Sequence, residues 1–153
     1  MGGATLPLGD LDDNGVETGF NIAGIAEIGA PLVPLSFRID AMWSQLDYEF
    51  DGGIIPPGFL GDPDDGLRLV SVTGNFKYAM SGIGLRPYLM GGGGYYNVRA
   101  AGAETQHEVG INAGAGLELL LTGLTTFAEV RFHHIFTEGE SMQILPISVG
   151  IRF

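Results

Sequence analysis

The last stretch of the chain, from Gln143 to Phe153, alternates between apolar side chains and small or polar ones. Side chains on a β-strand point to opposite faces with a period of two, so this pattern predicts a strand with one apolar face. The apolar series is Leu145, Ile147, Val149, Ile151 and Phe153, and the other series is Pro146, Ser148, Gly150 and Arg152. Such a strand either buries its apolar face in a soluble core or turns it to lipid around a polar lumen.

The same period of two recurs along the chain and predicts an all-β protein of eight strands. We expect the earlier seven strands at Gly3–Leu8, Thr18–Gly29, Leu35–Phe50, Leu67–Met80, Ile83–Val98, His107–Leu121 and Leu124–Phe136. Consecutive strands can all be joined as antiparallel hairpins, with no long crossover connection between them.

The connections between these strands alternate in length. The longer, polar ones are Gly9–Glu17, Asp51–Gly66, Arg99–Gln106 and Thr137–Met142, and the short ones are Ala30–Pro34, Ser81–Gly82 and Thr122–Gly123. Long loops at one end and tight turns at the other are typical of an up-and-down barrel. The sequence therefore predicts a single barrel domain over residues 1–153, with both termini at the tight-turn end.

Composition excludes several other classes of protein. The 153 residues carry a net charge of -11 and contain no cysteine, so we expect neither a nucleic-acid partner nor a disulfide. No run of 18 apolar residues is present, which excludes a transmembrane helix. Met1 is not followed by a basic segment and an apolar stretch, so we expect no signal peptide, and an exported protein would be a mature form.

Charged side chains in the middle of the strands bear on the choice between a soluble and a membrane barrel. Nine of them share the less apolar face: Glu27, Arg38, Asp40, Lys77, Arg86, Glu118, Glu129, Arg131 and Arg152. A soluble barrel could place them outside, around a core containing Phe20, Ile39, Trp43, Phe76, Leu117, Leu119, Phe132 and Phe153. Its outer face would then be unusually rich in glycine, alanine and serine.

The aromatic residues favour the membrane barrel, because they gather near the strand ends as the two interfacial girdles do. Toward the long loops lie Phe20, Trp43, Tyr48, Phe50, Tyr95 and Phe136, and toward the tight turns lie Phe37, Tyr78, Phe127 and Phe153. We therefore favour an eight-stranded antiparallel transmembrane β-barrel, and the soluble barrel with an apolar ligand inside stays open as an alternative.

Several segments resemble small bacterial outer-membrane β-barrel proteins of the OmpA- and OmpX-like class. They are LPLGD at Leu6–Asp10, FRIDAMW at Phe37–Trp43, RPYLMGGGGYYNV at Arg86–Val98, GINAGAGLELLL at Gly110–Leu121, FAEVRFHHIF at Phe127–Phe136 and PISVGIRF at the end of the chain. The resemblance implies the outer membrane of a Gram-negative cell envelope, with outer-membrane lipid and lipopolysaccharide (LPS) as partners. It also implies that Val149, Ile151 and Phe153 are similar to the signal read by the barrel-assembly machinery.

Two acidic loops are candidate calcium sites. Asp10, Asp12 and Asn14 match the front of a calcium-binding loop, and Asp62, Asp64 and Asp65 form a second acidic turn. The first loop lacks the closing glutamate, because Asn21 stands at that position. Since Asp, Asn and Gly are also ordinary turn residues, we favour no metal and expect no other cofactor.

Catalytic candidates are weaker. His133 and His134 are adjacent and point to opposite faces of a strand, so they cannot jointly bind a metal. Ser44, Ser71 and Ser148 show no recognisable spacing with a histidine and an acid, and the Gly91–Gly94 run lacks the spacing of a phosphate loop. We therefore expect a protein that is not an enzyme.

The nine inward charges, together with His133, predict a lumen closed by salt bridges, because an eight-stranded barrel is only wide enough for its own side chains. We expect Glu129 and Arg131 to be central, with neighbouring strands bringing Glu118 and Arg152 alongside. Tyr88, Met90 and Tyr96 add bulk, whereas Gly92, Gly94, Gly114, Gly116 and Gly150 leave space for water or a small ligand. The sequence therefore favours a structural or surface-interaction protein, and a narrow channel or transporter of small or lipid-like molecules is the alternative.

Overall fold

The computed structural model describes residues 1–9, 16–29, 33–47, 66–99, 105–121, 124–137 and 141–152. Its strands are β1 (Gly2–Leu8), β2 (Gly19–Gly29), β3 (Leu35–Asp47), β4 (Gly66–Ala79), β5 (Leu85–Arg99), β6 (Gln106–Leu121), β7 (Leu124–Phe136) and β8 (Ser141–Arg152). Within these ranges no helix has the length and apolar character needed to cross a membrane.

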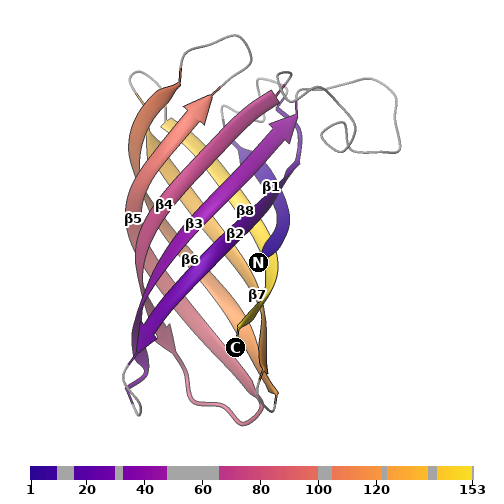
Figure 1. Ribbon diagram of the computed structural model, residues 1–153, viewed down its shortest axis with the longest axis vertical. Coiled ribbons are helices and arrows are strands. Elements are labelled where there is room, and N and C mark those ends of the chain that lie inside the picture. Colours follow the sequence, from indigo (N-terminus) through magenta and orange to yellow (C-terminus); the bar gives the residue numbers. More distant parts are fainter. Residues whose placement is uncertain are drawn as a thin grey trace, which may run out of the picture.

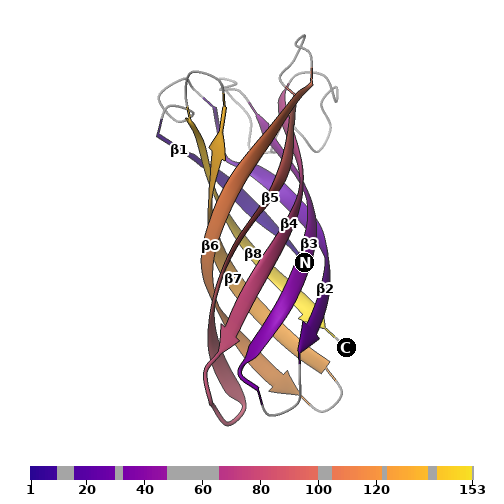
Figure 2. The ribbon, with the colours of Figure 1, turned by 90° about the vertical axis from the view of Figure 1, so that its left-hand side faces the viewer.

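The eight strands pair in chain order, each antiparallel to the next, and β1 also pairs with β8. The sheet therefore closes into an up-and-down barrel of tilted strands (Figure 1, Figure 2). This confirms the fold predicted from the period of two. We call the end where β1 ends and β2 begins the loop end, and the end where β2 ends and β3 begins the turn end.

Apolar side chains cover the outside of the barrel along most of its length. Six of the strands each supply an example of an exposed apolar side chain: Ile22, Ile39, Val72, Leu117, Val130 and Val149. The exposed fraction is 53% for Val72 and 66% for Val149, whereas their strand neighbours Thr73 and Ser148 are buried inside. A soluble barrel with Ile39, Phe76 and Leu117 in its core is therefore wrong, because these side chains lie on the outer surface.

One of the predicted short turns was wrong. The connection between β4 and β5 is not the two-residue turn Ser81–Gly82, because β4 ends at Ala79 and β5 begins at Leu85. Gly84 lies in this wider turn with a φ of 79°, a left-handed conformation that glycine adopts without strain. The predicted turn Thr122–Gly123 lies outside the described residues.

The first strand also departs from expectation. Gly2 pairs with Ile22 on one side and Val149 on the other, and the Met1 amino group donates to the Ala23 carbonyl at 2.8 Å. Met1 therefore lies part-way along the barrel wall, whereas β8 continues to Arg152 near the turn end (Figure 1). The prediction that both termini lie at the turn end was wrong for the amino terminus.

Aromatic side chains pair near both ends of the outer surface. Phe20 and Trp43 pack edge to face toward the loop end, with ring centroids 5.1 Å apart, and Phe37 and Phe76 do so at 5.6 Å toward the turn end. Phe127 was wrongly assigned to the turn-end group, because its side chain is buried inside the barrel. Three further members of the predicted girdles, Tyr48, Phe50 and Phe153, lie outside the described residues.

Candidate functional site: the interior of the barrel

Four charged side chains meet in the middle of the lumen, and we call them the central ion cluster. They are Arg38 and Asp40 from β3, and Glu129 and Arg131 from β7. Arg38 Nη1 lies 2.7 Å from Glu129 Oε2, and Arg131 Nη2 lies 3.2 Å from Asp40 Oδ1. Because β3 and β7 are not neighbours in the sheet, these two ion pairs cross the lumen.

Neutral side chains complete the hydrogen bonding of the central ion cluster. The Tyr88 hydroxyl donates to Glu129 Oε2 at 2.6 Å, and Asn75 Nδ2 donates to Asp40 Oδ2 at 2.8 Å. All four charged side chains are almost completely buried. A buried charge is tolerated when it is paired and hydrogen-bonded, and this cluster meets both conditions.

The other five predicted luminal charges form a second group, the turn-side ion cluster: Glu27, Lys77, Arg86, Glu118 and Arg152. Lys77 Nζ lies 3.0 Å from Glu27 Oε2 and also contacts Glu118. Arg86 pairs with Glu118 at 2.8 Å, and Arg152 pairs with Glu27 at 2.6 Å. The Lys77 ammonium also lies 4.5 Å from the centre of the Tyr88 ring, so Tyr88 contacts both clusters.

The structure thus brings all nine predicted charges into ion pairs, but it divides them differently from the sequence-based interpretation. Glu129 and Arg131 are central, yet their partners are Arg38 and Asp40 rather than Glu118 and Arg152. The pairing register explains this, because Glu129 lies opposite Gly116 and Ser148, whereas Glu118 lies opposite Arg86 and Phe127.

The loop end of the lumen is filled by apolar side chains, which the sequence interpretation missed. This loop-side core consists of Val16, Met42, Leu46, Leu67, Leu69, Tyr96, Val98, Ile135, Met142 and Ile144. Leu46, Leu69, Ile135 and Ile144 have no exposed surface. The available signal was the presence of apolar residues on the inward face of β3, β4, β5, β7 and β8 near the loop end.

Polar residues occupy the outer face where the interior turns apolar. Arg68 and Arg99 lie opposite each other on β4 and β5; Arg68 stands between the core residues Leu67 and Leu69, and Arg99 follows the core residue Val98. The Arg68 guanidinium also lies 5.9 Å from the centre of the Trp43 ring. Along most of its length the barrel has an apolar outer face and a polar interior. Beyond the aromatic residues at the loop end, the interior is apolar and the outer face carries polar residues.

Most of the space beside the inward glycines is occupied by neighbouring atoms. A Cβ on Gly116 would lie 2.3 Å from the Tyr88 ring, and a Cβ on Gly150 would lie 2.4 Å from the Phe127 ring. At Gly92 and Gly94 the backbone of β4 is close, at 2.0 and 2.1 Å, and at Gly114 the nearest atom is a carbonyl oxygen at 2.8 Å. These glycines therefore allow close packing, and the prediction that they leave open space was wrong at all five positions.

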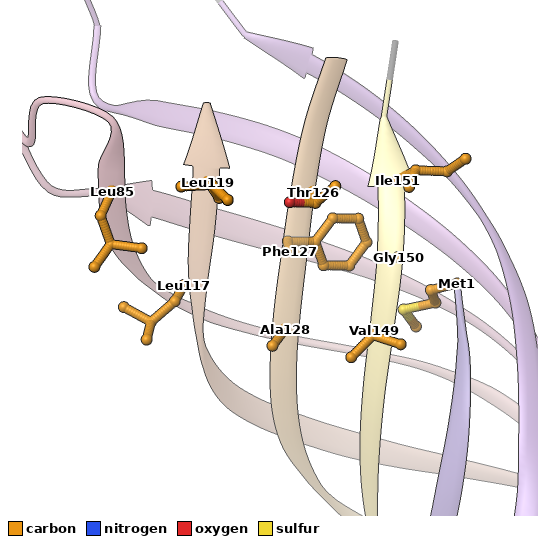
Figure 3. A pocket seen from close by; sticks show the side chains of 10 residues that line it. All are labelled: Met1, Leu85, Leu117, Leu119, Thr126, Phe127, Ala128, Val149, Gly150 and Ile151. Carbon is orange, nitrogen blue, oxygen red and sulfur yellow. The ribbon is translucent and has the colours of Figure 1, made fainter. Parts of the chain in front are cut away.

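A cavity of about 430 Å³ lies on the turn side of the central ion cluster, and it is bordered by Arg38, Lys77, Tyr88, Glu118 and Arg152. Outside the barrel, a shallow groove of about 680 Å³ runs over β6, β7 and β8. Its lining is almost wholly apolar, as Figure 3 shows, and it includes the inward positions Phe127 and Gly150 beside the start of β1: Met1, Leu85, Leu117, Leu119, Thr126, Phe127, Ala128, Val149, Gly150 and Ile151.

The remaining candidates lie inside the barrel, on its outer face, or outside the described residues. His133 is buried and its Nδ1 lies 2.8 Å from the Tyr96 hydroxyl, whereas His134 packs against Phe136 on the outer face. The candidate calcium ligands Asp10, Asp12, Asn14, Asp62, Asp64 and Asp65 lie outside the described residues. Within the described part of the chain, no three His, Asp or Glu side chains are grouped so as to hold a metal ion.

The barrel has the fold of small eight-stranded outer-membrane proteins. The crystal structure of Neisserial surface protein A (NspA) matches with a TM-score of 0.67 and 14% identity, over 98% of this chain and 90% of that one. The outer membrane enzyme PagL matches with a TM-score of 0.58 and 13% identity, over 99% of this chain and 97% of that one. No family model matches the sequence, and no curated protein matches it.

Proposed function

We propose that this chain is an integral protein of the bacterial outer membrane with a closed lumen, and that it has a structural or surface-interaction role without catalysis. The observation that carries this proposal is the central ion cluster, in which Arg38 and Asp40 pair with Glu129 and Arg131 across the lumen. Separating these pairs would leave uncompensated buried charges, which costs several kcal/mol.

The distribution of polarity supports membrane residence. Lipid can accept a wholly apolar outer surface, whereas water would favour burying it. The aromatic pairs near both ends of the barrel stand where the interfacial girdles of a membrane barrel are expected. The polar outer face and the loop-side core then belong to a part of the barrel that extends into water at the loop end.

The loop-side core supports closure independently of the ions. Leu46, Leu69, Ile135 and Ile144 occupy the lumen between the loop end and the central ion cluster. A hydrated ion passing through would have to displace close-packed apolar side chains as well as separate salt bridges.

The partners follow from the resemblance to outer-membrane barrels. We propose outer-membrane lipid and LPS around the barrel, with LPS phosphates held at the acidic loops through shared divalent cations. We also propose recognition of the last strand by the barrel-assembly machinery. The outward positions Val149 and Ile151 of this strand are exposed, which is compatible with such recognition.

The contacts of His133 support a role in packing rather than catalysis. Its ring contacts Tyr96, whereas Ser44 and Ser148 are hydrogen-bonded to Thr5 and Asn21 on the other side of the lumen. PagL, which shares the fold, is an enzyme, so the absence of catalysis rests on these contacts and not on the fold.

A narrow channel or transporter is the second candidate, and the turn-side cavity favours it. This cavity of about 430 Å³ carries both charged and apolar groups along its wall. A small or lipid-like molecule could enter it if the central ion cluster opened during transport.

Reconstitution into liposomes tests the proposal in two parts. We expect the refolded protein to need detergent or lipid, to resist extraction by alkaline carbonate, and to migrate differently on gels before and after heating. Liposomes containing it should not swell in an iso-osmotic solution of a small sugar. Stability in buffer without detergent would refute membrane residence, and swelling would refute closure in favour of the channel.

A further inference from the structure

Three buried side chains in the lumen carry polar atoms that have no hydrogen-bond partner in the protein. The atoms are Asn75 Oδ1, both amide atoms of Asn112, and His133 Nε2. The exposed fractions of Asn75, Asn112 and His133 are 0%, 5% and 1%. A buried polar group without a partner is unfavourable, so native proteins normally supply one from the chain or from a bound molecule.

The three residues lie on a single row across the sheet. Asn75 on β4 is opposite Gly92 on β5, Gly92 is opposite Asn112 on β6, and Asn112 is opposite His133 on β7. Residues directly opposite in an antiparallel pair have neighbouring side chains, so Asn112 and His133 are adjacent. Gly92 has no side chain to separate Asn75 from Asn112.

Hydrogen bonds fix which atoms face this row. Asn75 Nδ2 donates to Asp40, which turns Asn75 Oδ1 over Gly92, where a Cβ would lie 2.5 Å from that oxygen. The Tyr96 hydroxyl contacts His133 Nδ1, which leaves Nε2 for another partner. On its own strand Asn112 is flanked by Gly110 and Gly114, and the side chains of Tyr96 and Arg131 pack over these two glycines.

On the opposite side of the lumen, the buried polar side chains are hydrogen-bonded to one another, as is usual in proteins. Thr5, Asn21, Ser44 and Ser148 are joined by hydrogen bonds between 2.7 and 3.0 Å. Asn97 Oδ1 also has no partner, but Asn97 lies on the outward face of β5, beside Tyr96 on the inward face. Among the described residues, unpartnered polar atoms inside the lumen are therefore concentrated on this one row.

The surroundings define the kind of molecule that fits. The central ion cluster beside the row carries two positive and two negative charges that pair with one another, so its net charge favours neither an anion nor a cation. Tyr96 and Ile135 are buried on the loop side of the row, Ile144 lies opposite His133 at the end of the row, and Met90 is buried on its turn side. The ligand must be small and neutral, and it must both donate and accept hydrogen bonds.

We propose that the lumen holds ordered water between Asn75, Asn112 and His133. A buried water molecule typically makes about three hydrogen bonds to groups that are otherwise unsatisfied, which is what this row offers. The water would connect the Tyr96–His133 pair to Asn75, and through Asn75 to Asp40 of the central ion cluster. This site goes beyond the proposed function, because it concerns how the interior is filled and does not require that the lumen is closed to ions.

Nuclear magnetic resonance of the refolded, ¹⁵N-labelled protein in detergent micelles tests the proposal. We expect the Asn112 amide protons and the His133 ring to show direct cross-relaxation with long-lived water. Asn112→Leu should abolish the cross-relaxation between water and the His133 ring. It should also lower the Tm by about 2–4 °C or more, because the water loses two of its hydrogen-bonding groups and Asn75 and His133 are left without a partner. Asn97→Leu is the matched control, and it should leave the His133 signals unchanged.

Asn112→Ser keeps a hydrogen-bonding group and should retain the water signal, so it serves if Asn112→Leu does not fold. Absence of water cross-relaxation in the wild type, together with a higher Tm for Asn112→Leu, would overturn the proposal. A stoichiometric shift of the His133 ring signals by zinc, reversed by a chelator, would also overturn it and would assign the row to a cation.

Discussion

Arg38 on β3 and Glu129 on β7 form an ion pair of 2.7 Å across the lumen, although they are 91 positions apart in the sequence. Both side chains are buried, and Arg131 and Tyr88 also contact Glu129. Glu129 is therefore the carboxylate around which the central ion cluster is arranged.

Replacing Glu129 by alanine should destabilise the barrel strongly. Arg38 and Arg131 would both lose their carboxylate partner in a buried place, and removing one partner of a buried pair typically costs about 3–5 kcal/mol. The free energy of unfolding in urea, measured for the protein folded into lipid vesicles, checks this. The double variant Glu129→Ala/Arg131→Ala should lose less than the sum of the two single variants, and simple additivity would argue against coupling.

Arginine on the lipid-facing surface should be costly in the middle of the barrel. Val130→Arg should lower the free energy of unfolding by about 2–4 kcal/mol, because the charge would enter the hydrocarbon region. Gln143→Arg, on the outward face of β8 near the loop end, should cost only about 0–1 kcal/mol. Equal costs at the two positions in vesicles would contradict the placement of the membrane.

The loop-side core should respond to truncation as the core of a soluble protein does. Ile135→Ala should cost about 2–5 kcal/mol, because its side chain has no exposed surface and its loss leaves a cavity. Val109→Ala, an exposed position on the neighbouring strand, is the control and should cost much less. A small effect at Ile135 would mean that the loop end of the lumen is loosely filled.

Gly150 and Phe127 should be coupled. A Cβ on Gly150 would lie 2.4 Å from the Phe127 ring and 2.8 Å from the Met1 side chain, so Gly150→Ala should destabilise the wild type. In a Phe127→Ala background the same substitution should cost less, since the ring that it meets is gone. Unfolding of all four proteins of this cycle gives the coupling energy, and a value near zero would contradict the packing described here.

The period of two in the sequence predicted the barrel, the outward apolar face and the inward charges. Val72 and Thr73, for example, point to opposite sides as expected from their alternation alone. The separation into two ion clusters could not be predicted in this way. It depends on the stagger between strands, which decides that Arg38 reaches Glu129 across the lumen, and no single strand encodes that stagger.

The loop-side core was missed for a different reason. Near the loop end both faces of a strand carry apolar residues, as in β7, where Ile135 is inward and Phe136 outward. Alternation cannot distinguish inside from outside in such a segment. Extending the last strand from Gln143 back to Ser141 would have added Met142 to Ile144 on the inward face, and would have revealed part of this core.

The central claim is that the lumen is closed by side chains, and single-channel recording in planar lipid bilayers tests it most directly. We expect no steady current from the refolded wild type. If the loop-side core opens together with the central ion cluster, the Arg131→Ala variant and the Glu129→Ala variant should each conduct ions. Adding Ile135→Ala to either variant should then increase the conductance. A steady, ion-selective current from the wild type would contradict the account and would establish the barrel as a channel.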